Sequence, residues 1–198
     1  CRMNMEIRDT SASSTPQKEK KEGFWDLIKF AILALLIVVP IRTFIAQPFI
    51  VSGSSMVPTF ENNDYLIVDE LSYRINEPHR GDVVIFKWPK DTTKYFIKRI
   101  IGLPGETVKI AGNTIIIKNK DNPDGFILNE PYVKNKSNDE MEVTLPENQF
   151  FVMGDNRSGS ADSRAWGTLP RSLMVGKAFL RLFPFTSLTV LPRNYHSY

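Results

Sequence analysis

Three serines in one short stretch are the first candidates for chemistry in this chain. The stretch from Pro48 to Thr59 reads PFIVSGSSMVPT, so its serines and glycine lie among apolar residues. A simple surface turn explains that composition equally well. A serine hydroxyl becomes a good nucleophile only beside a general base, so the chemical interpretation depends on finding a base elsewhere in the chain.

The histidines are weak candidates for that base. His196 lies two residues from the C-terminus, where chains fray, and His79 lies in an EPHRG stretch typical of an exposed turn. A Ser-His-Asp triad therefore stays open with little support. A lysine can act as the base only when it is neutral, which requires an apolar site that lowers its pKa by several units from about 10.4.

The run YFIKRII, Tyr95–Ile101, offers an apolar site of this kind. On a strand, Phe96, Lys98 and Ile100 share one face, so Lys98 lies between two large apolar side chains. Arg99 points the other way, and a guanidinium does not lose its proton in proteins. The competing interpretation of Lys98 is an ordinary strand lysine whose ammonium reaches solvent.

A third polar segment, GDNRSGSADSR, runs from Gly154 to Arg164. Two Asp/Arg pairs within it, Asp155 with Arg157 and Asp162 with Arg164, could fix a loop through bidentate ion pairs. A serine in the same loop could hold and orient a lysine ammonium. The alternative is a solvated turn whose surface ion pairs contribute little to the stability of the fold.

Strands must position these segments, because no long helical period follows residue 50. Runs rich in β-branched and aromatic residues, bounded by Gly, Pro, Asn and Asp, predict a mainly β domain, a sandwich or a partly open barrel. Ala111-Gly112-Asn113 predicts a hairpin, and the polar residues 119–141 predict a surface excursion. The expected strands are Tyr65–Val68, Asp82–Lys87, Tyr95–Ile101, Thr107–Ile110, Thr114–Lys118, Glu142–Leu145, Phe150–Met153 and Val175–Phe183.

An apolar block precedes this domain. Leu27–Ala46 is 20 residues long, enough to span the roughly 30 Å of a bilayer core as a helix. It lacks the polar face of a soluble helix. A cleavable signal peptide is disfavoured because Ala46 has Phe44, which is not small, two residues before it. We therefore expect a single N-terminal transmembrane helix over residues 24–47.

The charges flanking the block predict its orientation. Lysines and arginines are concentrated before the block. The 20 residues that begin with Arg42 contain no other lysine or arginine. The positive-inside rule then places a flexible tail, residues 1–23, in the cytoplasm and a β-rich domain, residues 48–198, outside the plasma membrane.

Composition narrows the functional classes further. The chain has 198 residues, two histidines, one cysteine and a net charge of +3. One cysteine excludes an intrachain disulfide framework and a multi-cysteine zinc site. The modest charge does not indicate a nucleic-acid-binding surface.

The three segments together resemble the type I signal peptidases, or leader peptidases. SGSSMVPT resembles the family's nucleophile box, YFIKRIIGLPGE its lysine box, GDNRSGSADSRAWG its third box and PHRGDVVIF a further strand. Their order, spacing and preceding apolar block agree with the family, and the resemblance covers roughly residues 25–185. It is weakest over residues 119–141.

The resemblance implies roles for particular residues. Ser55 matches the nucleophile, with its backbone N–H in the oxyanion hole, and Lys98 matches the general base. Ser160 matches the serine that hydrogen-bonds and positions that lysine. Some members carry a serine donor where this chain has Gly53, so the second oxyanion donor is left open. Asp155, Arg157, Asp162 and Arg164 match the charged residues that hold the third loop.

The family also implies an activity: a membrane-anchored serine endopeptidase that removes signal peptides from exported preproteins, cleaving after small residues. The preprotein would bind as an added strand, close to the bilayer and the secretion translocon, without a metal or organic cofactor. We expect the walls of the substrate pocket to include Phe49, Val51, Met56, Phe60, Phe96 and Ile97.

Three other functions remain as alternatives. The soluble self-cleaving SOS-type repressors share Ser/Lys chemistry, but the apolar block argues against them. A peptidase specialised for one secretion or pilus system would carry the same residues. An anchored β domain that binds exported chains without cleaving them is the non-enzymatic alternative, against which the presence of both Ser55 and Lys98 argues.

Overall fold

A computed structural model describes residues 19–40 and 46–191 of the chain. The chain divides into two compact units, residues 1–40 and 41–198. The expectations for the tail before residue 19, for Phe44 and for His196 lie outside the described residues.

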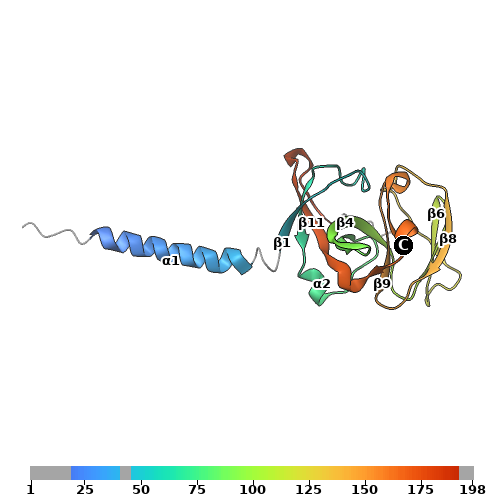
Figure 1. Cartoon of the computed structure of the whole chain (residues 1–198), viewed down its shortest axis with the longest axis horizontal. Coiled ribbons are helices and arrows are strands. Elements are labelled where there is room, and N and C mark those ends of the chain that lie inside the picture. Colours follow the sequence, from blue (N-terminus) through green and yellow to red (C-terminus); the bar gives the residue numbers. More distant parts are fainter. Residues whose placement is uncertain (1–18, 41–45, 192–198) are drawn as a thin grey trace, which may run out of the picture. The chain divides into compact units, whose positions relative to one another are not determined.

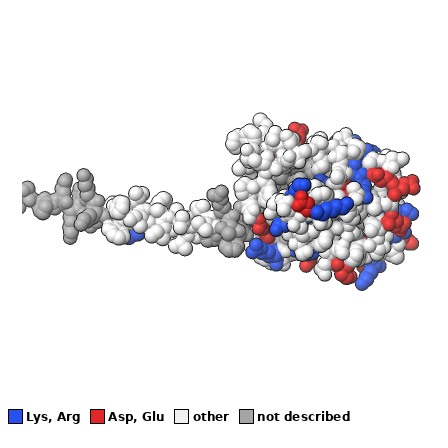
Figure 2. All heavy atoms as spheres, viewed as in Figure 1, with Lys and Arg blue, Asp and Glu red and all other residues white. Residues whose placement is uncertain are grey.

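The first unit contains one helix, α1, Glu19–Pro40. Its large apolar side chains between Phe24 and Val39 are mostly exposed, and its visible surface carries few charged atoms (Figure 2). Within the described part of the chain, no helix reaches the combined length and hydropathy of a membrane span. The helix ends at a proline, and Ala46 and Gln47, expected at the end of an anchor, begin a strand.

The second unit is mainly β, as expected, and both of its sheets are antiparallel (Figure 1). The larger sheet has the order β1-β2-β11-β3-β4-β9-β10, with β12 beside β11; the smaller has the order β7-β6-β5-β8. Its strands are β1 Ala46–Ile50, β2 Tyr65–Asp69, β3 Val83–Trp88, β4 Asp91–Gly102, β5 Thr107–Gly112, β6 Thr114–Lys118, β7 Phe126–Ile127, β8 Asp139–Thr144, β9 Gln149–Met153, β10 Leu169–Pro170, β11 Met174–Phe183 and β12 Thr189–Val190. Two one-turn helices, α2 Ser72–Ile75 and α3 Ser163–Trp166, and three 3₁₀ turns, Arg157–Gly159, Arg171–Leu173 and Phe185–Ser187, complete the described elements.

All eight expected strands occur, because alternation of apolar and polar residues is a local signal. The hairpin between β5 and β6 also occurs: Ala111 pairs with Thr114, and Gly112 has φ +60°, which glycine adopts without strain. The short strands β7, β10 and β12 and the strand β1, which contains Pro48, carry too little of this signal to be expected from the sequence.

Apolar side chains from both sheets form three buried clusters. One lies under β1, β2 and the turn that follows β1, and includes Met56, Phe60 and Leu66. A second joins the smaller sheet to the end of β4 and includes Ile101 and Val108. The third lies on the other face of β3, β4 and β9. The long strand β4 contacts all three, which makes it a rigid support for its side chains.

Candidate active site

Ser55 lies in a turn that is held at both ends by the sheet. Beyond β1, the Val51 N–H donates to the Asp64 carbonyl at 2.9 Å and the Asn63 N–H donates to the Val51 carbonyl at 2.9 Å. Within the turn, Met56 and Phe60 are almost fully buried, and the Phe60 N–H donates to the Met56 carbonyl at 3.0 Å. These side chains pack into the core beneath β1 and β2 and so fix the position of Ser55.

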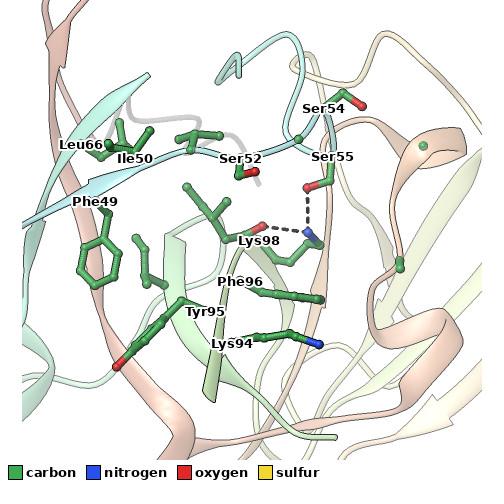
Figure 3. Close-up of a pocket in the computed structure, with 16 residues that line it drawn as sticks. Phe49, Ile50, Ser52, Ser54, Ser55, Leu66, Lys94, Tyr95, Phe96 and Lys98 are labelled. Carbon is green, nitrogen blue, oxygen red and sulfur yellow. Dashed lines mark hydrogen bonds between the residues drawn. The ribbon is translucent and has the colours of Figure 1, made fainter. Parts of the chain in front are cut away.

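Lys98 comes to this turn from the middle of β4, where it pairs with Val84 of β3. Its Nζ lies 2.7 Å from Ser55 Oγ and donates to the Ile97 carbonyl at 2.9 Å. Figure 3 shows the Ser55 hydroxyl directed at Lys98 and the Ser54 hydroxyl directed away from it. The tertiary structure thus brings together two side chains that are 43 residues apart in sequence.

The surroundings of Lys98 favour its neutral form. The residue is only 4% exposed, and its Nζ lies 5.4 Å from the centre of the Phe96 ring, which stacks on Trp88. Burial lowers the pKa of Lys98 to about 8, although the carboxylates of Asp162 and Asp155 act in the opposite direction. A neutral amine within hydrogen-bond distance of a serine hydroxyl can accept its proton.

Ion pairs hold the third loop, and one of them differs from the expected pairing. Asp162 and Arg164 do form a bidentate pair, at 2.8 Å for each contact. Asp155, however, pairs with Arg99 of β4, at 2.9 and 2.6 Å, and not with Arg157. The reason is the register of β4 and β9, which places Arg99 opposite Met153 and so brings the loop that follows β9 beside Arg99.

Arg157 pairs with Glu130, which belongs to the segment expected to be a surface excursion. Both side chains of this pair are less than a tenth exposed. In the same segment, Tyr132 is buried with its ring 4.0 Å from the Arg99 guanidinium. Residues 119–141 therefore contribute to the packing that supports the third loop.

Ser160 lies near the turn, but not in the expected contact. Its hydroxyl is buried and has no hydrogen-bond partner among the described residues, whereas the Nζ of Lys98 contacts Ser55 Oγ and the Ile97 carbonyl. A Cβ added to Gly154 would lie 2.3 Å from Ser160 Oγ and 2.4 Å from the Ser55 carbonyl oxygen. Gly154 is thus the residue that allows the third loop to approach the turn so closely.

A cavity of about 530 Å³ opens beside Ser55 and Lys98. Four of the expected wall residues line it: Phe49, Val51, Phe96 and Ile97. Met56 and Phe60 do not, because both point inward from the turn into the core. Leu66 of β2, Ile85 of β3 and Tyr95 of β4 also line the cavity, and no local pattern distinguishes them from core or surface residues of their strands.

Two backbone N–H groups of the turn, those of Gly53 and Ser55, differ in whether they already have a hydrogen-bond acceptor. Gly53, with φ +98°, uses its N–H to donate to Asn62 Oδ1 at 2.9 Å. The Ser55 N–H donates to no acceptor among the described residues. The side chain of His79, the alternative base, is exposed, and its Nδ1 lies 4.0 Å from Asp82 Oδ2.

Comparisons of this chain with a family model, with curated proteins and with solved structures all match the same family. Residues 24–183 match the family model described as "Signal peptidase, peptidase S26". The chain is 35% identical over 192 residues to a probable signal peptidase I-2 of Synechocystis sp., a match covering 93% of this chain and 84% of that protein. It is 36% identical over 190 residues to a signal peptidase I of Bacillus amyloliquefaciens, covering 92% and 96%. A crystal structure of a signal peptidase I from Enterococcus faecalis V583 has 32% identity and a TM-score of 0.44, and covers 52% of this chain and 97% of that one.

Proposed function

Because this chain belongs to the signal peptidase family, peptidase S26, and is a serine endopeptidase, we propose that it cleaves signal peptides from exported preproteins with Ser55 as nucleophile and Lys98 as general base. The observation that carries the proposal is the 2.7 Å contact between Lys98 Nζ and Ser55 Oγ. The lowered pKa of Lys98, about 8, supports it, because the amine is then partly neutral near physiological pH.

The reaction has two halves. Neutral Lys98 takes the Ser55 proton as Ser55 Oγ attacks the scissile carbonyl carbon, and the carbonyl oxygen becomes an oxyanion facing the Ser55 N–H. Lys98 then gives that proton to the departing amine, which leaves an acyl-enzyme. In the second half, Lys98 removes a proton from water, the water oxygen attacks the ester carbonyl carbon, and the bond to Ser55 Oγ breaks. Lys98 returns the proton to Ser55 Oγ, and the signal peptide leaves with a new C-terminal carboxyl group.

The cavity beside Ser55 suits an extended peptide. The segment Phe49–Val51 and the strand residues Phe96 and Ile97 face it from two sides, so a substrate strand can form backbone hydrogen bonds while alternate side chains enter apolar pockets. The resemblance to the family implies small residues at the cleavage position and two positions before it. Ser160, though without a bond to Lys98, stays a candidate for orienting the lysine when substrate excludes water.

We also place the enzyme at the plasma membrane, as a single-pass protein with its N-terminus in the cytoplasm. The support is the 20-residue apolar run Leu27–Ala46 with its charge asymmetry and the exposed apolar surface of α1. An anchor in the bilayer would keep Ser55 near the end of a substrate's own signal helix and raise its effective concentration, close to the translocon.

A preprotein with an Ala-x-Ala cleavage site tests the proposal. The purified full chain should release one new N-terminus, identified by mass spectrometry, whereas Ser55→Ala and Lys98→Ala should both lower cleavage to background. Ser54→Ala is the matched control, since its hydroxyl points away from Lys98 (Figure 3), and it should keep its activity. Cleavage by folded Lys98→Ala at the wild-type rate would refute the Ser/Lys mechanism.

A further inference from the structure

Asn156 bonds to both peptide groups that flank Ser55. Its side-chain Nδ2 donates to the Ser54 carbonyl at 3.0 Å, and its backbone N–H donates to the Ser55 carbonyl at 3.0 Å. We propose that Asn156 is a positioning residue that aims the Ser55 N–H at the oxyanion formed during cleavage. This inference rests on the proposed role of Ser55.

The planar peptide group couples the direction of the Ser54 carbonyl to that of the Ser55 N–H. The peptide bond between Ser54 and Ser55 is not among the cis bonds of the described chain, so its C=O and N–H point in opposite directions. The Ser54 carbonyl accepts from Asn156 and, at 3.2 Å, from the Val57 N–H. A donor that holds the carbonyl on one side therefore fixes the Ser55 N–H on the other side, away from Asn156.

That N–H is left available by the rest of the described structure. Among the described residues it donates to no acceptor, although Ser55 itself lines the cavity. The N–H of Gly53 is already bonded to Asn62. Preorganised donors of this kind stabilise an oxyanion because they need no reorientation during the reaction.

Asn156 is itself held firmly enough to act in this way. Its carbonyl accepts from the Gly159 N–H at 3.1 Å, and a Cβ at Gly159 would lie 2.7 Å from its Nδ2, so the amide is closely packed. The preceding residue, Asp155, is bonded to Arg99 of β4 and to Thr59. The orientation of the nucleophile's peptide group is thus tied through the third loop to a buried ion pair.

Loss of the side-chain amide should affect the transition state more than substrate binding. Removing a direct oxyanion donor lowers kcat by about 10²- to 10³-fold. Asn156 acts through the peptide group, and the Val57 N–H would still hold the same carbonyl, so we expect Asn156→Ala and Asn156→Asp to lower kcat by about 10- to 100-fold. KM should stay within about threefold, because the cavity walls are unchanged.

Two inhibitors separate this role from a general structural one. The first is an Ala-x-Ala peptide aldehyde, whose carbonyl carbon is attacked by Ser55 Oγ while the serine proton passes to Lys98, leaving an oxyanion. The second is the same peptide ending in an unreactive carboxamide. With the purified full chain, the Asn156 variants should lose affinity for the aldehyde in parallel with kcat, and their affinity for the carboxamide should not change.

Asn62→Ala is the matched control. Its side chain also bonds to a backbone group of the same turn, the Gly53 N–H, at 2.9 Å, but that peptide group does not adjoin Ser55. It should keep kcat within about threefold of wild type.

Three results would overturn the inference: unchanged kcat in folded Asn156 variants, equal loss of affinity for aldehyde and carboxamide, or an equal loss of kcat in Asn62→Ala. If thermal melts show that Asn156→Ala is unfolded, the same measurements on Asn156→Asp test the inference. This variant preserves the shape of the side chain. Cleavage by Ser55→Ala would instead refute the proposed function itself.

Discussion

The titration of Lys98 gives the sharpest test of the proposed chemistry. Only the neutral amine can accept the Ser55 proton, and burial lowers the pKa of Lys98 from 10.5 to about 8. The neutral fraction is then about 0.09 at pH 7, one half at pH 8 and about 0.9 at pH 9. We therefore expect kcat/KM to rise about tenfold from pH 7 to pH 9 and to level off above it.

The assay is cleavage of an Ala-x-Ala peptide by the full chain at substrate concentrations well below KM, where the profile reports the free enzyme. Binding of the carboxamide peptide at each pH controls for changes in the cavity, and circular dichroism controls for unfolding. A profile that is flat between pH 7 and pH 9, with the protein folded throughout, would refute a titrating lysine base. A fall in rate over that interval would do the same.

Two further predictions concern stability, measured by urea unfolding. Because the pKa of Lys98 is lower in the native state, the unfolded state binds more protons between about pH 8 and pH 10.5, so wild-type stability gains about 3 kcal/mol as pH rises through that window. Lys98→Met lacks this gain, and a wild-type-minus-variant difference that is constant with pH would contradict the lowered pKa. Arg99→Met should lower the free energy of unfolding by about 3–5 kcal/mol, because it leaves the fully buried carboxylate of Asp155 without its cationic partner. The control Lys118→Met breaks the half-exposed pair with Glu142 and should lower the free energy of unfolding by less than about 1 kcal/mol. Similar losses in the two variants would argue against a buried Arg99–Asp155 pair.

The expected pairing of charges shows where reasoning from sequence reaches its limit. Asp155 and Arg157 are two positions apart in the chain, and this spacing predicts a bidentate pair between them. Strand pairing instead places Arg99, 56 residues away, beside Asp155, and Arg157 binds Glu130 from a segment with no strong pattern. Partners of buried charges depend on strand neighbours, which a local pattern does not specify.

The walls of the cavity illustrate the same limit. From the sequence we expect Met56 and Phe60 as wall residues, yet the turn directs both into the core. Leu66 and Ile85 line the cavity instead, because β2 and β3 lie in the same sheet as β1 and β4. Side-chain direction in a turn depends on its backbone conformation, which the sequence motif does not reveal by inspection.

The sequence by itself determined eight of the twelve described strands, the mainly β class and the residue types for serine-lysine chemistry, because alternation and motif spacing are properties of consecutive residues. Only the tertiary structure decided that Lys98 Nζ lies 2.7 Å from Ser55 Oγ, that burial lowers the pKa of this amine to about 8, and that Asn156 bonds to the peptide groups on both sides of Ser55. A distance, a pKa and a peptide orientation each depend on residues that are remote in sequence and become neighbours only when β1, β4 and the loop after β9 pack together.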